Sequence, residues 1–344
     1  MPDTFAIYRL PHSSECHFVR GEGETLASLD VLCGRSGYVI APFAIDSQTP
    51  LVLIRPEVHL RFDSPEAIDE QVANMVDSIV PARRNEANEG LPTNRKTYST
   101  DFALFHSHLV SGEFSKIVLS RHAEAAITRS PMDMFRRACD LYPRMFITLF
   151  ASPWSGAWMV ATPEILLEAE GGEWRTIALA GTMPLSEDGE GAWSDKNIRE
   201  QRYVATYIGD RVRRFAKDLQ ESGPRTVRAG HLMHLRSDFT FSTADTNIGA
   251  LLSALHPTPA VCGLPKEEAR AFILKNEHCQ RRYYSGFCGP MAMDGATHLF
   301  VTLRCMSLTD RRLYAGGGLL SESDEQAEWD ETEAKMATMR ALTQ

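Results

Sequence analysis

The chain has 344 residues, of which 43% are hydrophobic and 24% are charged, and its formal net charge is −9. This size and composition allow a sizeable core in one large domain or two ordinary ones. The negative charge disfavours a nucleic-acid or anionic-membrane partner, and no stretch approaches the roughly 18 consecutive apolar residues that a membrane-spanning helix needs.

The N-terminus and the cysteines both favour a cytoplasmic protein. The first residues, MPDTFAIYRLPHSSE, contain no basic segment followed by an apolar run, so they do not resemble a signal peptide. The seven cysteines are scattered and form no C-x-x-C pair. An odd number of dispersed cysteines suits free thiols in a reducing cytoplasm better than a disulfide framework or a zinc site.

Short apolar runs separated by turn residues predict strands over the first 80 residues, with a helix near 64–79. Residues 81–97 are polar and rich in Pro, Asn and Gly, which is typical of an exposed loop or linker. We interpret residues 1–97 as strands, a helix and a polar linker that form part of the same fold as a catalytic core over residues 98–344.

Helical and strand patterns come in blocks along the rest of the chain. Helices are predicted over 98–112, after Pro131, and over 195–219, 246–256 and 266–277. Strands are predicted over 115–127, 144–184 and 283–315. Within the last block, MDGA at 293–296 indicates a tight hairpin turn. A final helix is predicted near the C-terminus, where Ser323 and Gln326 resemble a capping box.

This block order argues against a doubly wound parallel sheet. It predicts an α+β fold of packed antiparallel sheets flanked by helices. The order of a helix followed by several strands occurs twice, which is compatible with an internal duplication, although no sequence repeat supports one.

The final helix begins with an unusual concentration of acids. Seven carboxylates occupy the twelve positions from Glu322 to Glu333. On a helix Glu328, Glu331 and Lys335 fall within roughly 60° of arc. One interpretation is a solvated face. The other is a Mg²⁺ site, which needs only one or two protein carboxylates together with water and substrate oxygens. Glu200, in DKNIREQ, is a candidate for a further carboxylate from elsewhere in the chain.

Eight segments together resemble the chorismate-utilising enzymes, which include isochorismate, salicylate, anthranilate and aminodeoxychorismate synthases. They are FSKIVLSR, TPEILLE, ALAGTMP, DKNIREQ, HPTPAVCGLP, YYSGFCGP, VTLRC and YAGGGLL…EWDETEAK, and they occur in the family's order over residues 114 to 335. The resemblance implies an α+β fold of packed antiparallel sheets, dependence on Mg²⁺, and chorismate as substrate.

The resemblance also implies which acids bind the metal. Glu200 and Glu331 match the family's two metal-binding glutamates, and Glu328 lies nearby, where it would act through water. A divalent cation would allow a dicarboxylate substrate to enter an acidic pocket. We therefore expect Glu328, Glu331 and Lys335 to face the site. The remaining acids of this segment are expected to be solvated: Asp324, Glu325, Asp330 and Glu333.

Two residues match the family's general base and general acid. Lys116 corresponds to the lysine that activates water, and burial beside Phe114 and Val118 would lower its pKa as a base requires. Glu164 corresponds to the acid that protonates the departing ring hydroxyl. The alternatives are an edge-strand lysine that reaches solvent and an exposed carboxylate.

Three positions distinguish the branches of the family. Anthranilate synthases resemble one another in having glutamine where this chain has Lys116. Aminodeoxychorismate synthases have a lysine, proposed as nucleophile, where this chain has Ala180. Ala260 follows the isochorismate synthase pattern, whereas members that eliminate pyruvate or aminate the ring tend to have threonine there.

The remaining motif positions are expected to contact substrate. Arg304 has the planar fork that suits a carboxylate. Glycines such as Gly317 and Gly318 let backbone N–H groups approach a carboxylate closely. Substrate contacts are also expected at Gly181, Thr182, His234, Ala260, Tyr284 and Lys335.

The sequence thus predicts a cytoplasmic, Mg²⁺-dependent isochorismate synthase that acts as a monomer or homodimer without a glutamine amidotransferase partner. A salicylate synthase, an ammonia-using synthase and a non-catalytic relative are the alternatives. The motifs do not distinguish menaquinone from siderophore biosynthesis.

Overall fold

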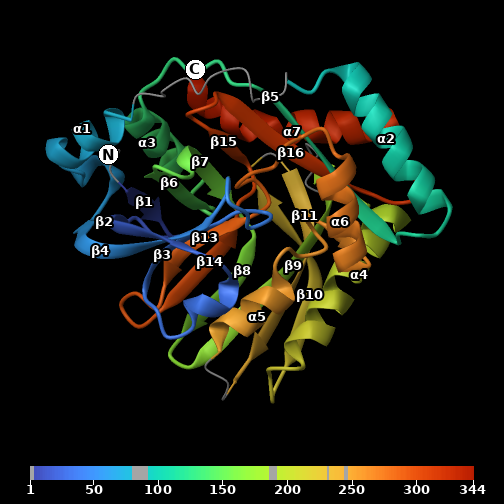
Figure 1. Cartoon of the computed structure of the whole chain (residues 1–344), viewed down its shortest axis with the longest axis horizontal. Helices are drawn as coiled ribbons and strands as arrows, with labels where there is room; N and C mark the ends of the chain where they lie inside the picture. Colours follow the sequence, from blue (N-terminus) through green and yellow to red (C-terminus); the bar gives the residue numbers. More distant parts are fainter. Residues whose placement is uncertain (1–3, 80–91, 186–191, 231, 244–246) are drawn as a thin grey trace.

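The computed structural model describes residues 4–79, 92–185, 192–230, 232–243 and 247–344. Within these residues the strands form one 16-stranded antiparallel sheet with the order β10-β11-β9-β8-β14-β13-β3-β4-β2-β1-β6-β7-β15-β16-β5-β12 (Figure 1). The strands are β1 (Phe5–Arg9), β2 (Cys16–Leu26), β3 (Gly37–Ala41), β4 (Leu51–Phe62), β5 (Lys116–Glu124), β6 (Phe146–Ser152), β7 (Gly156–Thr162), β8 (Ile165–Glu170), β9 (Glu173–Pro184), β10 (Gln220–Ala229), β11 (Leu232–Phe241), β12 (Gly263–Leu264), β13 (Phe287–Met291), β14 (Thr297–Val301), β15 (Cys305–Ser307) and β16 (Arg312–Leu319).

Helices cover the outside of this sheet. The α-helices in the described residues are α1 (Glu70–Asp77), α2 (Arg95–Val110), α3 (Pro131–Leu141), α4 (Asp195–Val212), α5 (Ile248–Leu255), α6 (Lys266–Asn276) and α7 (Glu325–Thr343). Helices α4 and α5 pack on one outer face, and α1, α3 and α7 pack on the other. Helices α2 and α6 form a further apolar cluster with β5.

The sheet folds over on itself, so that its two halves enclose an inner core. Strands β6 and β14 are separated by five strands in the sheet order. Nevertheless, the rings of Phe146 and Phe300, one from each strand, stack with centroids 4.2 Å apart. Folding in this way brings strands from the two ends of the order close together.

Strands β1, β3, β6 and β13 are buried on both faces, and their successive side chains belong to different cores. In β1, Phe5 and Ile7 belong to an outer cluster, whereas Ala6 and Tyr8 belong to the inner one. This alternation is the two-residue period of a strand. Because neither face meets water, the sequence of such a strand is a continuous apolar run.

The N-terminal segment supplies the middle of the sheet, since β1 to β4 lie together there. Residues 81–91 of the predicted linker lie outside the described residues. The last part of the predicted linker is helical, because α2 already begins at Arg95, with the side chain of Asn94 as its N-cap.

The α+β architecture with antiparallel pairing is confirmed, and so is the tight turn at MDGA. Met293 and Ala296 form a bridge, and the two residues between them have positive φ, 52° for Asp294 and 80° for Gly295. Positive φ at both central residues is the requirement of a two-residue type I′ hairpin loop.

Two sequence-based expectations are wrong. The predicted helix over 195–219 ends at Val212, and a hairpin of β10 and β11 follows that the sequence patterns did not predict. Strand β10 is an exposed, polar edge strand that contains Pro224 and lacks apolar alternation. The last helix is capped by Asp324, which accepts a 2.9 Å hydrogen bond from Ala327 N, and not by Ser323.

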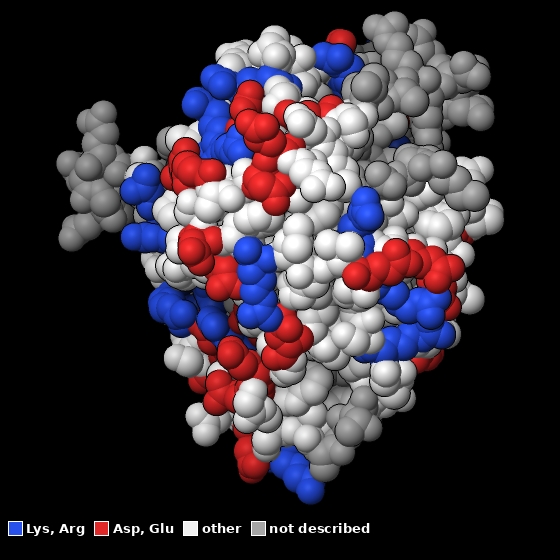
Figure 2. All heavy atoms as spheres, turned by 90° about the vertical axis from the view of Figure 1, so that its left-hand side faces the viewer, with Lys and Arg blue, Asp and Glu red and all other residues white. Residues whose placement is uncertain are grey.

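On the face shown in Figure 2, basic and acidic side chains of the described residues are intermixed. Neither sign forms a broad uninterrupted surface there, so this face lacks the uniform field that attracts a polyanion. None of the described helices is long and apolar enough to cross a membrane.

Candidate active site

A pocket lies where the two ends of the folded sheet meet. Its empty volume, counting the open mouth, is about 580 Å³, which is within the range of small-molecule sites. Strands β9 and β11 border it from one end of the sheet order, and β5 and β16 border it from the other. Ten of the predicted site residues line it: Glu164, Gly181, Thr182, Glu200, His234, Ala260, Tyr284, Arg304, Gly318 and Lys335.

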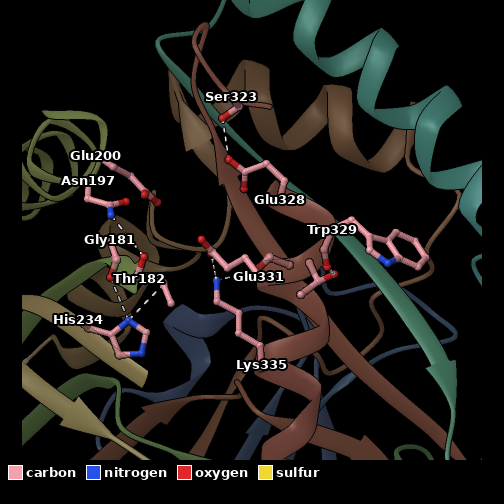
Figure 3. A network of polar contacts seen from close by, with 12 residues as sticks. Gly181, Thr182, Asn197, Glu200, His234, Ser323, Glu328, Trp329, Glu331 and Lys335 are labelled. Carbon is pink, nitrogen blue, oxygen red and sulfur yellow. Dashed lines mark hydrogen bonds and ion pairs between the residues drawn. The ribbon is translucent and has the colours of Figure 1, made fainter. Parts of the chain in front are cut away.

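The other four predicted residues lie directly behind this lining. Lys116, at the start of β5, is fully buried, and its Nζ lies 3.0 Å from Glu200 Oε1 of α4. Glu331 accepts a 2.6 Å hydrogen bond from Lys335 Nζ. Gly317 and Glu328 are in contact with each other, as described below. Residues from β5, β16, α4 and α7 therefore converge on one region. Figure 3 shows the members from α4 and α7.

Glu328 is a buried carboxylate with one satisfied oxygen and one free oxygen. Its Oε1 accepts a 2.8 Å hydrogen bond from Ser323 Oγ and contacts Lys196 Nζ of α4. Its Oε2 is buried and has no hydrogen-bond partner among the described residues. Burial, reinforced by the nearby Glu331, raises the pKa of Glu328 to about 7. A buried oxygen of this kind is costly unless a ligand satisfies it.

Two adjacent glycines leave the space into which these carboxylates extend. A Cβ on Gly318 would lie 2.1 Å from Glu200 Oε1 and 2.8 Å from Lys116 Cε. A Cβ on Gly317 would lie 2.7 Å from Glu328 Oε2 and 4.0 Å from Glu331 Oε1. The three glutamates therefore approach the same short stretch of β16 from two different helices. Any side chain in place of these glycines would displace the glutamates.

These residues fit a divalent cation of the Mg²⁺ kind. No three acidic, His or Cys side chains of the described residues form a ready cluster for a metal. Mg²⁺, however, needs only one or two protein carboxylates and takes its other ligands from water and substrate. The unsatisfied Glu328 Oε2 and the space beside the two glycines are what such an ion requires.

His234 and Arg304 form a chain of hydrogen bonds that ends in the pocket. Arg304 Nη2 lies 2.8 Å from His234 Nε2. Because a guanidinium only donates, Nε2 is the acceptor, and the proton is on Nδ1, which donates to Gly181 O at 3.0 Å. Burial and the charge of Arg304 lower the pKa of His234 well below its ordinary value. The imidazole is therefore a neutral support for the arginine.

Arg304 has one hydrogen-bond donor that is not used within the described residues. The residue is 6% exposed, and its Nη1 is buried without a hydrogen-bond partner among the described residues. A β-bulge helps to build this support, since the register of β9 and β11 shifts between His234 and Leu235. Gly181 is the extra residue and has a φ of 75°, a left-handed conformation that glycine adopts without strain.

Glu164 lies at the entrance to β8 and is 3% exposed. Burial raises its pKa to about 7, and the positive charges of Lys116 and Arg304 oppose this shift. A carboxyl group with such a pKa holds its proton near neutral pH and can act as a general acid.

The rest of the lining is largely apolar or aromatic. Tyr284 and Tyr314 stack with ring centroids 5.7 Å apart. Ala180 and Ala260 contribute no polar group at two of the three positions that distinguish the branches of the family that the sequence resembles. Lining residues that the motifs did not single out as contacts are Val118, Leu179, Val261, Leu303, Tyr314, Ala315 and Gly316.

The division of the α7 acids into solvated and site-facing residues differs from the expectation. Asp324 and Asp330 are exposed, as expected. Glu325 is not simply solvated, because it pairs with Arg95 at 2.9 Å. Glu333 pairs with Arg121 and Arg340. Sequence reasoning also missed Lys196, for which the only signal was its position one turn before Glu200 on the predicted helix.

The fold and this pocket define a protein with a small-molecule site, and comparisons with known proteins identify its family. A family model described as chorismate binding enzyme matches residues 53–343. The chain therefore belongs to the chorismate binding enzymes.

Named relatives are similar over part of their length. The chain is 31% identical to isochorismate synthase MenF of Escherichia coli over 250 residues, which cover 69% of this chain and 57% of the relative. It is 34% identical to isochorismate synthase DhbC of Bacillus subtilis over 192 residues, 52% of this chain and 48% of the relative. The chain thus spans about half the length of these relatives.

A solved structure shares the fold over nearly the whole chain. It is the crystal structure of the putative 2,3-dihydroxybenzoate-specific isochorismate synthase DhbC from Bacillus anthracis, with a TM-score of 0.80 and 23% identity. The match covers 99% of this chain and 97% of that chain.

Proposed function

We propose that this chain is an isochorismate synthase that isomerises chorismate to isochorismate. The observation that carries the proposal is one pocket bordered by a buried lysine, a buried carboxyl group with a pKa near 7 and an arginine with a free donor. These are the groups that water addition, hydroxyl departure and carboxylate binding respectively need. The names of the relatives support the same reaction.

In this reaction one water adds to the ring and one leaves, so substrate and product are isomers. Lys116 would take a proton from the water whose oxygen bonds to C2. The ring double bonds shift, and the C4–oxygen bond breaks. Glu164 would give its proton to that oxygen, which departs as water. Arg304 Nη1 would hold a substrate carboxylate while His234 fixes the guanidinium plane.

Glu200 and Glu331, with Glu328 acting through water, would hold Mg²⁺ next to the ring carboxylate. When bound, the ion supplies the positive charge that lets a dicarboxylate enter a site lined by glutamates. Lys335, which is paired with Glu331 and donates to Gly316 O at 2.9 Å, would contact the substrate. Gly181, Thr182, Ala260, Tyr284, Gly317 and Gly318 would surround it.

Three residues at or directly behind the pocket lining favour this reaction over those of related synthases. A lysine at 116 supplies a base for water. Alanine at 180 removes the nucleophile of the aminodeoxychorismate branch, and alanine at 260 lacks the hydroxyl of members that eliminate pyruvate or aminate. We further propose that the enzyme acts in the cytoplasm, as a monomer or homodimer and without a glutamine amidotransferase, in menaquinone or siderophore biosynthesis.

The test is incubation of the purified protein with chorismate and Mg²⁺ in the absence of ammonia, followed by chromatography of the products. We expect isochorismate with little salicylate, and loss of the product when EDTA is added. Salicylate and pyruvate as main products would instead identify a salicylate synthase. Turnover only with ammonia would identify an aminating synthase, and no turnover would indicate a non-catalytic relative.

A further inference from the structure

Lys196 is a charged residue beside the proposed metal site to which the proposed reaction gives no role. It lies in the first turn of α4, four residues before Glu200, and its Nζ contacts Glu328 Oε1 of α7. Its side chain is 23% exposed, whereas that of Glu328 is 2% exposed. Lys196 is not among the residues that line the pocket. The contact therefore joins two helices behind the substrate space.

This contact completes a pattern in which each of the three glutamates is paired with its own lysine. Glu200 pairs with Lys116, and Glu331 pairs with Lys335. Glu328 pairs with Lys196. The formal charges of these six side chains cancel. The pattern offsets the repulsion among three closely placed acids, since like charges at this spacing repel strongly in a partly buried site.

The two oxygens of Glu328 have different surroundings. Oε1 is occupied by Ser323 and Lys196. Oε2 has no partner among the described residues and points toward the space beside Gly317, which Glu331 also approaches. Figure 3 shows Glu200 entering from α4, opposite Glu328 and Glu331 from α7. A cation that uses Oε2 through water would therefore share one carboxylate with the ammonium group of Lys196.

We propose that Lys196 is a positioning residue whose charge, held against Glu328, opposes the binding of a divalent cation there. This inference rests on the proposed metal site. A positive charge held against the same carboxylate weakens the attraction of the site for Mg²⁺. The three lysines and three glutamates have a net formal charge of zero. Mg²⁺ and a dicarboxylate substrate carry opposite charges of equal size, so binding both of them leaves this net charge unchanged. The device thus favours joint occupation by metal and substrate over occupation by metal alone.

The inference makes a prediction opposite to that of a simple structural role. If Lys196 only held Glu328 in place, its removal would disorder a metal ligand and weaken Mg²⁺ binding. If it competes with the cation, its removal strengthens binding. A coupling of the usual size between two neighbouring charged groups corresponds to a change in affinity of about tenfold.

The experiment is calorimetric titration of the whole chain with Mg²⁺ alone, without chorismate, at pH 8.5. Three variants are compared with the unmodified protein. Lys196→Met removes the charge, and Lys196→Arg keeps it. Arg202→Met removes a charge from the same helix at a residue that pairs with Glu221, 2.9 Å away, and that is 53% exposed. Circular dichroism and thermal unfolding verify that each variant is folded.

We expect Lys196→Met to bind Mg²⁺ about tenfold more tightly, whereas Lys196→Arg and Arg202→Met bind it as the unmodified chain does. An unchanged or weaker affinity of Lys196→Met would overturn the inference while leaving the proposed reaction intact, because product analysis tests that reaction separately. Absence of Mg²⁺ binding in every protein would overturn the inference together with the metal site.

Discussion

Two buried ion pairs flank strand β5, and they differ in how completely their atoms are satisfied. Behind the pocket, Arg281 and Glu277 of the 277–281 segment are paired at 2.6 Å, with side chains 3% and 1% exposed. Arg281 also donates to Val261 O at 2.6 Å and Val118 O at 2.8 Å, and Glu277 accepts from Ser120 N at 2.7 Å. This network ties β5 to the loop that carries Ala260.

The pair at the pocket is different. Lys116 Nζ is 3.0 Å from Glu200 Oε1, yet the geometry does not make a hydrogen bond, and this nitrogen has no such partner among the described residues. Glu328 Oε2 and Arg304 Nη1 nearby are also unsatisfied. Buried charges that are fully hydrogen-bonded hold a structure together, whereas unsatisfied ones are tolerated where a ligand completes them. The comparison therefore separates a structural pair from the proposed functional one within a few residues of the same strand.

The largest effect should come from the pocket pair. Lys116→Gln keeps a polar side chain of similar length but removes the base, so we expect kcat for isochorismate formation to fall about 10²–10⁴-fold. The measurement is the initial rate with saturating chorismate and Mg²⁺, alongside the urea midpoint of the variant. A rate within tenfold of the unmodified enzyme would show that Lys116 is not the base.

Breaking the Arg281–Glu277 pair should lower the stability of the protein, whereas Lys116→Gln should lower its catalytic rate. Arg281→Ala leaves Glu277 buried without its counter-ion, and we expect the free energy of unfolding to fall by about 3–5 kcal/mol. Urea denaturation measures this loss. Arg202→Ala removes one member of the exposed Arg202–Glu221 pair and should cost at most about 1 kcal/mol. Equal losses in the two variants would remove the distinction between buried and exposed pairs.

Adding one carbon at the pocket tests whether the pocket pair must keep its position. In Gly318→Ala the new Cβ would displace Glu200 Oε1 and Lys116 Cε, which it would approach to 2.1 and 2.8 Å. A displacement of a catalytic group by about 1 Å can lower activity about 100-fold, so we expect a fall of this size in kcat/KM. Both displaced atoms are near the ends of flexible side chains, so we expect little change in the free energy of unfolding. Steady-state kinetics and thermal unfolding measure the two quantities.

The matched control is Gly112→Ala. Gly112 has a φ of 80°, and nothing lies within 4 Å of the added carbon. This variant should lose about 1 kcal/mol of stability through backbone strain and keep its activity. If Gly318→Ala lost stability and not activity, the glycine would serve packing alone.

The smallest effect is a gradual dependence on pH. Burial raises the pKa of Glu164 to about 7, and the proposed acid is active only when protonated. The value of kcat/KM should therefore be insensitive to Glu164 below that pKa and fall about tenfold per pH unit above it. A pH profile of the unmodified enzyme measures this limb. The residual activity of Glu164→Gln should lack it, and a limb that persists in the variant would belong to another group.

The sequence by itself determined the class of fold, and its motifs pointed to residues that the structure brings together at one pocket. Apolar runs and turn signals identified most strands, because burial on both faces leaves a local mark on each of them. The turn at Asp294 and Gly295 was equally local. The hairpin of β10 and β11 left no such local signal, because an exposed polar edge strand owes its structure to the strand it pairs with.

Only the tertiary structure decided which charges meet. Lys196 and Glu328 are 132 residues apart in the chain, and nothing in the sequence near either residue indicates the other. The same holds for Ser323, which contacts Glu328 where a helix cap was predicted, and for the neutral His234 that supports Arg304. Local patterns report which element and which face a residue occupies. The folding-over of the sheet, which brings its ends and two helices around one pocket, determines its partners.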